Sequence, residues 1–144
     1  MIFDFASLRF VQQERELRNV QLSLTVIVVS YNSADMIISC QDSLVRSNKY
    51  STIIVDNASS DRSAEKLRRH FDGVQIEALE KNIGYGRAAN VGLRMVQTPY
   101  ALLLNPDILA TPEDVIRLLT HAVGDECAAI WGPVAGTEEL DDSP

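Results

Sequence analysis

Cysteines, long apolar runs and basic residues are all scarce in this sequence of 144 residues. Cys40 and Cys127 lie far apart and outside any Cys-x-x-Cys pair, so neither a zinc knuckle nor a thioredoxin-like motif is present, and we expect two reduced, buried thiols. Apolar stretches such as Leu24 to Val29 and Tyr100 to Leu104 are too short to span a bilayer, and no basic region followed by an apolar core opens the chain. We therefore expect a soluble, cytoplasmic protein.

The charge balance restricts the class of partner. The chain has 13 basic and 20 acidic residues, a net charge of -7, which repels polyanions and argues against nucleic acid as the main partner. A small phosphorylated ligand is compatible with this charge if a divalent cation lies between its phosphates and the protein's carboxylates. With 46% hydrophobic residues, the chain is long enough for one domain with its own core.

What is present is an alternation of short apolar runs and amphipathic stretches, which indicates βα units around a parallel sheet. The runs are too uniformly apolar for a sheet with one wet face, so we expect an α/β fold of three layers (α/β/α) with a mostly parallel sheet. The expected strands are Leu24 to Ser30, Thr52 to Asp56, Val74 to Ala78, Tyr100 to Leu104 and Ala128 to Trp131. The expected helices are Ala34 to Asn48, Ser63 to Phe71, Gly86 to Val96 and Pro112 to Val123.

The last helix has the clearest start signal, because Thr111 and Asp114 fit a capping box and Pro112 occupies the first helical position. Residues 1 to 21 are polar with scattered aromatic residues, and we expect either a loosely held leader or a helix that contacts a partner or a membrane surface. Residues 138 to 144 are expected to form a solvated acidic tail. The domain then spans residues 22 to 137.

The segment Asn105, Pro106, Asp107 follows an apolar strand and is the strongest candidate site. Pro106 cannot donate to a sheet ladder, so the strand should end here and leave the Asp107 carboxylate outside the sheet edge, where open α/β sheets bind ligands. Mg²⁺ or Mn²⁺ typically takes one or two protein carboxylates and completes its shell with water and phosphates. Asp107 is therefore a candidate metal ligand, although Pro-Asp pairs are also common in plain turns.

Two further loops follow expected strands. In the first, Tyr31 could offer its ring to a base while Ser30 and Asn32 donate hydrogen bonds, but capping of the next helix explains Asn32 and Ser33 more simply. In the second, the Asp56 carboxylate could accept the imide N–H of a uracil or thymine ring. Asp61, just before the helix at Ser63, is explained by helix capping and receives no ligand role.

The segment from Asn82 to Gly92 opens a helix, and Gly84 and Gly86 allow close backbone approach. Gly84, Gly86 and Ala89 also match the relaxed dinucleotide fingerprint, with Asp107 about 20 residues further on. We discount that match because the fingerprint should follow the first strand, whereas this segment follows the third. Together, the loops after the second, third and fourth strands would converge on one edge of the sheet.

These segments resemble the family 2 glycosyltransferases, whose GT-A fold binds a nucleotide-sugar donor. The resemblance covers roughly Leu24 to Trp131. It implies that the first two segments hold the base and ribose, that the glycine segment lies beside the donor, and that the last segment is the DXD motif, which binds metal and diphosphate. The residues that it assigns to nucleotide-sugar binding are Ser30, Tyr31, Asn32, Asp56, Asn82, Gly84, Gly86, Asn90 and Asn105.

Carried over, Tyr31 would contact the base, Asp56 its imide, and Asp107 a Mn²⁺ or Mg²⁺ ion. Asn105 replaces the first acid of the motif, a form that looks like the rhamnosyltransferase-like members. The resemblance implies an inverting transfer from a UDP or dTDP sugar to the hydroxyl of a saccharide or lipid-linked acceptor, in cell-surface polysaccharide synthesis. It also admits a further partner chain, or peripheral association with the inner membrane face.

Family members continue into an acceptor-binding half that supplies the catalytic base, whereas 37 residues (144 minus 107) follow Asp107 here, and no acid among them looks placed for that role. The alternative is a truncated or non-catalytic nucleotide-sugar binding module. A flavodoxin-like phosphoacceptor signalling domain would also be short and α/β, with an acid near Asp56. It needs paired acids after the first strand and a lysine after the fifth, where this chain has Tyr31, Asn32 and Gly132, Pro133.

Overall fold

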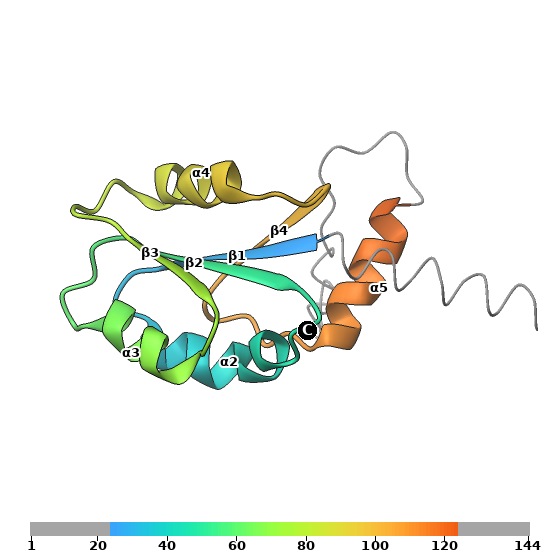
Figure 1. Cartoon of the computed structure of the whole chain (residues 1–144), viewed down its shortest axis with the longest axis horizontal. Helices are drawn as coiled ribbons and strands as arrows, with labels where there is room; N and C mark the ends of the chain where they lie inside the picture. The colour runs from blue at the N-terminus through green and yellow to red at the C-terminus, as the bar shows by residue number, and fades with distance from the viewer. Residues whose placement is uncertain (1–23, 124–144) are drawn as a thin grey trace, which may run out of the picture.

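The computed structural model describes residues 24–123, which form a parallel four-stranded sheet in the order β3-β2-β1-β4 (Figure 1). Neighbouring strands pair in parallel throughout. The strands are β1 (Leu24–Ser30), β2 (Ser51–Asp56), β3 (Gln75–Ala78) and β4 (Tyr100–Leu104). The helices are α2 (Ala34–Arg46), α3 (Ser63–His70), α4 (Tyr85–Met95) and α5 (Pro112–Val123). The expected α/β fold is confirmed.

Helices cover both faces of the sheet, with α2 and α3 on one side and α4 on the other (Figure 1). The chain runs from β1 through α2 to β2 and through α3 to β3, and then returns over the opposite face through α4 to β4. The strand order therefore reverses between β1 and β4. In open α/β sheets such a switch point, at the carboxyl ends of the strands, is where ligands bind.

The core has two parts, one on each face of the sheet. On the α2 face, Val26, Val28 and Ile54 pack with residues of α2, α3 and α5, while the smaller cluster on the α4 face includes Val29, Val55 and Ala88. Helix α4 lies unusually close to the sheet because of Gly92, where an added Cβ would lie 2.6 Å from Ile27 Cγ2 and 3.2 Å from Val55 Cγ2. A side chain at this position would overfill the core.

Element boundaries differ from expectation by one or two residues. Helix α2 ends at Arg46 because Asn48 adopts a left-handed conformation, with φ 51°. Helix α3 ends at His70 because Phe71 is extended, and α4 begins at Tyr85 and ends before the extended Val96. Strand β2 begins one residue early and β3 one residue late, whereas β1, β4 and α5 have the expected bounds. The expected strand at 128–131, the leader at 1–21 and the acidic tail at 138–144 lie outside the described residues.

Strands β3 and β4 are less buried than their apolar sequences indicated. Strand β1 is buried along its length, but Gln75, Glu77 and Ala78 of β3 and Tyr100 and Leu103 of β4 are exposed. Burial on both faces was wrong for these strands, which lie at the two edges of the described sheet, whereas helix α4 packs mainly on the central strands β1 and β2.

Two expectations about composition can be compared with the structure. Cys40 is a free thiol but only partly buried, so full burial was wrong for it, and Cys127 lies outside the described residues. Within residues 24–123, every helix is too short or too polar to cross a membrane.

Candidate functional site

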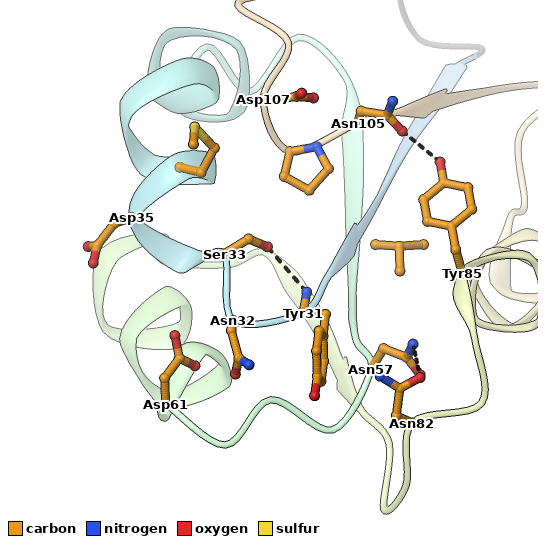
Figure 2. Close-up of a pocket in the computed structure, with 13 residues that line it drawn as sticks. Tyr31, Asn32, Ser33, Asp35, Asn57, Asp61, Asn82, Tyr85, Asn105 and Asp107 are labelled. Atoms are coloured by element: carbon orange, nitrogen blue, oxygen red, sulfur yellow. Dashed lines mark hydrogen bonds between the residues drawn. The ribbon is translucent and has the colours of Figure 1, made fainter.

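A cavity of about 710 Å³ lies at the carboxyl ends of the strands and is lined by residues from the four loops that follow them. Figure 2 shows polar side chains from these loops and from the start of α2 and α4 around one hollow. The lining residues are Val29, Tyr31, Asn32, Ser33, Asp35, Met36, Asn57, Asp61, Asn82, Tyr85, Asn105, Pro106 and Asp107. The expected convergence of the strand-end loops is thus observed.

The loop after β1 presents Tyr31 to the cavity with 52% of its surface exposed. Asn32 beside it adopts a left-handed backbone with φ 51°, which asparagine tolerates better than most residues. Its side-chain oxygen accepts a hydrogen bond from the Ser60 N–H at 2.9 Å, and its own N–H donates to Ser59 Oγ at 2.8 Å. These bonds tie the β1 loop to the β2 loop and leave the Tyr31 ring accessible.

Ser33 occupies the N-cap position of α2, but its side chain makes no capping hydrogen bond and that of Asn32 bonds to Ser60 instead, so side-chain capping was wrong as an interpretation of both residues. Ser33 Oγ instead accepts from the Tyr31 N–H at 3.2 Å and lies 3.1 Å from Ser30 Oγ, and Ser30 is fully buried behind the cavity. The first N–H of the helix, at Ala34, donates to Ser63 Oγ of α3 at 3.3 Å. A partner distant in sequence has taken the role expected of the local side chains.

The loop after β2 contributes Asn57 and Asp61 to the cavity rather than Asp56. The Asp56 carboxylate is 2% exposed and accepts hydrogen bonds from Ser59 Oγ at 2.6 Å and from Ser59 N–H at 3.0 Å. Asn57 Nδ2 donates to Asn82 Oδ1 at 3.0 Å, which joins the β2 loop to the segment before α4. Sequence reasoning missed Asn57, whose only signal was its place beside a candidate acid.

Of the glycine segment, only Asn82 and Tyr85 reach the cavity. Asn82 Oδ1 accepts from the Gly84 N–H at 3.0 Å, and Gly84 precedes α4 with φ 83°, a conformation that favours glycine. Gly84 and Gly86 lie outside the cavity lining, as does Asn90, whose side chain is exposed on α4. Gly84 therefore shapes the approach to the helix that carries Tyr85.

The segment after β4 is a turn, closed by a hydrogen bond from Ile108 N–H to the Asn105 carbonyl at 3.2 Å. Pro106 occupies the second position, which its fixed φ suits, and Asp107 the third. Tyr85 Oη donates to Asn105 Oδ1 at 2.9 Å across the cavity, as Figure 2 shows. Burial raises the pKa of Tyr85, so its hydroxyl remains a donor at neutral pH. The turn interpretation is correct, and the same turn places Asp107 at the cavity.

Three carboxylates line the cavity, and their partners differ. Asp35 is paired with Lys66 Nζ at 2.5 Å. Asp61 Oδ1 accepts from Ser63 Oγ at 2.6 Å and from Ser63 N–H at 2.9 Å, and the hydroxyl hydrogen bond lowers the pKa of Asp61. Asp107 is exposed and has neither a hydrogen-bond nor an ion-pair partner within residues 24–123. It is therefore the carboxylate with its oxygens available to a ligand.

The donor chemistry fits a hard divalent cation. The cavity lining has three carboxylates and four asparagine side chains but neither lysine nor arginine, and oxygen atoms are the ligands that Mg²⁺ and Mn²⁺ prefer. In the part of the chain that the structure describes, no group of three or more His, Cys, Asp or Glu side chains could hold a metal alone. Asp107 would thus hold a cation whose shell is completed by phosphate oxygens and water.

Comparison with curated proteins finds relatives that are named as a polymerase or as sugar transferases. The chain is 32% identical over 90 residues to the teichoic acid poly(glycerol phosphate) polymerase of Staphylococcus epidermidis, covering 58% of this chain and 12% of that protein. It is 30% identical over 123 residues to the undecaprenyl-phosphate 4-deoxy-4-formamido-L-arabinose transferase of Edwardsiella ictaluri, covering 83% and 35%. It is 28% identical over 123 residues to the poly(ribitol-phosphate) beta-glucosyltransferase of Bacillus spizizenii, covering 80% and 19%.

The chain therefore corresponds to between 12% and 35% of the length of these relatives. The family model named Glycosyl transferase family 2 matches residues 25–142, which is more than half of the chain and includes the whole cavity. The parallel sheet flanked by helices on both faces is consistent with the GT-A fold of that family. On this evidence the chain belongs to glycosyl transferase family 2.

Proposed function

We propose that this chain binds a nucleoside-diphosphate sugar of the UDP or dTDP type and supplies the donor-binding part of a glycosyltransferase. The observation that carries the proposal is Asp107, an exposed carboxylate without a partner in residues 24–123, at the cavity and at the switch point of the sheet. Asp107 would hold Mn²⁺ or Mg²⁺ against the diphosphate, and Tyr31 would lie against the base. The rhamnosyltransferase-like subtype stays a prediction.

The charge of the cavity explains why a cation is needed. Asp61 and Asp107 line it without an ion-pair partner in residues 24–123, Lys66 neutralises Asp35, and no lysine or arginine lines the cavity itself, so a diphosphate entering alone would be repelled. A divalent cation at Asp107 reverses that local balance. Donor binding should therefore depend strongly on metal, more than in a site where basic side chains neutralise the phosphates.

Base recognition is assigned to Asp56, with Ser30 and Asn32 near the base and ribose. Each Asp56 oxygen accepts one hydrogen bond from Ser59, and a carboxylate has about four lone-pair positions, so capacity for an imide N–H remains. Because Asp56 is buried behind the lining, the segment that contains Ser59 must move before the base can reach the Asp56 carboxylate. Asn82, Gly84, Gly86 and Asn90 then form or support the wall beside the donor, with Tyr85 and Asn105.

The proposed reaction transfers the sugar to the hydroxyl of a saccharide or lipid-linked acceptor in cell-surface polysaccharide synthesis. The names of the relatives, which include undecaprenyl-phosphate and poly(ribitol-phosphate), support this class of acceptor. When bound, the cation would stabilise negative charge on the departing diphosphate. In this proposal the residues of this chain bind and orient the donor. No residue is assigned as the base that deprotonates the acceptor, and inversion at the anomeric carbon stays a prediction.

Calorimetric titration of UDP, dTDP and GDP sugars, each with and without Mn²⁺, tests this proposal. We expect the uridine and thymidine donors to bind more tightly than the guanosine donor, and Mn²⁺ to strengthen binding about tenfold or more, equal to about 1.4 kcal/mol. The imide contact with Asp56 accounts for the preference for uridine and thymidine donors. The acidic lining, which repels a diphosphate without a cation, accounts for the effect of Mn²⁺. Absence of binding to all three donors, or binding that ignores Mn²⁺, would contradict the proposal.

A second candidate is a nucleotide-sugar binding module that does not itself catalyse transfer. It is kept as the alternative because, within residues 24–123, the proposal assigns donor-binding residues but no base that deprotonates an acceptor. Assays of sugar transfer and of donor hydrolysis by this chain separate the two candidates. Donor binding without either reaction supports the module, whereas transfer by the chain without any partner would end that alternative.

A further inference from the structure

Gln41 of α2 is a polar side chain in an otherwise apolar part of the core. It is fully buried, as is Ile37 one turn earlier on the same helix, and Leu44 after it is 2% exposed. Its Nε2 donates to the Asn105 carbonyl at 2.7 Å, which links α2 directly to the turn that carries Asp107. Its Oε1 is buried without a hydrogen-bond partner in the described part of the chain.

The carbonyl that Gln41 contacts is also the one that closes the turn. Ile108 N–H donates to the same Asn105 oxygen at 3.2 Å, with Pro106 and Asp107 between them. On the opposite face of the sheet, Tyr85 Oη of α4 donates to Asn105 Oδ1 at 2.9 Å (Figure 2). Asn105 is thus held by both helical layers, its main chain from α2 and its side chain from α4.

The unpaired oxygen shows that stability alone does not account for Gln41. A buried amide that satisfies only part of its hydrogen-bonding capacity is less favourable than an apolar side chain of similar volume. Methionine or leucine would fill this position beside Ile37 and Leu44 without that penalty. What glutamine provides and they do not is a donor to the Asn105 carbonyl.

We propose that Gln41 is a positioning residue, whose hydrogen bond to Asn105 fixes the turn so that the Asp107 carboxylate faces the cavity. The inference rests on the proposed function, in which Asp107 holds the cation and diphosphate. Gln41 acts through the turn and contacts neither group. Its loss should loosen the turn and weaken the metal-assisted part of donor binding, leaving the metal-independent part unchanged.

The test compares Gln41→Met with Leu44→Met, a volume-conserving change at a buried α2 position with no hydrogen bond to the turn. Backbone ¹⁵N relaxation reports the order of the Asp107 and Ile108 amides, and titration with UDP reports affinity with Mn²⁺ and with EDTA. For Gln41→Met we expect lower order parameters at both amides and about a tenfold loss of affinity in Mn²⁺ only. Leu44→Met should match the wild type in both measurements.

Unchanged order at Asp107 and Ile108 in Gln41→Met would overturn the inference, and so would lost order with unchanged Mn²⁺-dependent affinity. If Gln41→Met does not fold, Gln41→Leu is measured in the same way. Failure of the proposed function would look different, because the wild type itself would then bind UDP equally with and without Mn²⁺. The relaxation comparison needs no ligand and decides in that case whether Gln41 holds the turn.

Discussion

Asp35, Asp61 and Asp107 line one cavity, yet only their local partners decide what each can do. Lys66 neutralises Asp35, and Ser63 occupies an oxygen of Asp61 with two hydrogen bonds, so both carboxylates serve the packing of α2 and α3. Asp107 sits at the third position of a turn, where no described side chain reaches it. The residue with the least structural support is therefore the one that can bind a ligand.

The assignment of Asp56 to the base predicts a difference between nucleotides. Asp56→Ala removes the acceptor for an imide N–H, so we expect UDP and dTDP to lose about tenfold more affinity than GDP, measured by calorimetry in Mn²⁺. Asp35→Asn, a change at an exposed carboxylate paired with Lys66, is the control and should affect all bases equally. Equal losses for all three nucleotides in Asp56→Ala would rule out the imide contact.

The hydrogen bonds of Asp42, which lies outside the cavity lining, predict that the stability of the fold depends on pH. Hydrogen bonds from Arg46 and then from His70 lower its pKa from the ordinary 3.8. A carboxyl group whose pKa is lower in the folded state stabilises the fold when the pH is above its unfolded-state pKa. That contribution to the free energy of unfolding is lost as the pH falls through the folded-state pKa. Asp42→Asn should therefore lower stability at pH 6, by no more than about 1 kcal/mol because water screens these exposed side chains.

Urea unfolding of the wild type and of Asp42→Asn, measured from about pH 6 to about pH 2.5, provides the check. This range includes the ordinary pKa of a carboxyl group. The difference in the free energy of unfolding should shrink as the pH falls below the ordinary value. A difference that stays constant across the series would show that the ionised carboxylate is not its source.

At the scale of elements, the close approach of α4 to the sheet depends on Gly92. Gly92→Ala would place a Cβ 2.6 Å from Ile27 Cγ2, and overfilling of this kind typically costs about 1–3 kcal/mol. Gly86→Ala on the same helix is the matched control, since nothing lies within 4 Å of its added Cβ and alanine is the better helix former by about 0.5–1 kcal/mol. Denaturant unfolding should show opposite signs for the two variants, and equal effects would refute the close-packing argument.

The order of the elements could be predicted from the sequence because periodicity and capping are local signals. Thr111 and Asp114 form the expected capping box, with the Thr111 N–H donating to Asp114 Oδ2 at 3.0 Å and the Asp114 N–H to Thr111 Oγ1 at 3.2 Å. The start of α2 at Ala34 was predicted, but the partner of its first N–H was not, because the Ala34 N–H is satisfied by Ser63 from another helix. Edge exposure of β3 and β4 also depends on strand order, which apolar runs do not encode.

At the scale of the whole molecule, parallel pairing explains how much of the site was predictable. The carboxyl ends of parallel strands meet at one edge, so Asn82, Asn105 and Asp107, from the loops after the third and fourth strands, lie together there as expected, and Tyr31 joins them from the loop after the first. Asn57, Tyr85 and Asp35 were missed as lining residues because their places depend on how loops and helices turn into the cavity. Membership of glycosyl transferase family 2 also excludes the phosphoacceptor signalling domain as an interpretation.

The most direct test of the account is the Mn²⁺ dependence of UDP affinity in single-carboxylate variants of the cavity. Calorimetry in Mn²⁺ and in EDTA would be run on the wild type, Asp107→Asn, Asp35→Asn and Asp61→Asn. The account predicts that the gain from Mn²⁺, about tenfold or more, disappears in Asp107→Asn and persists in the other two variants. Retention of the full Mn²⁺ effect by Asp107→Asn would contradict it.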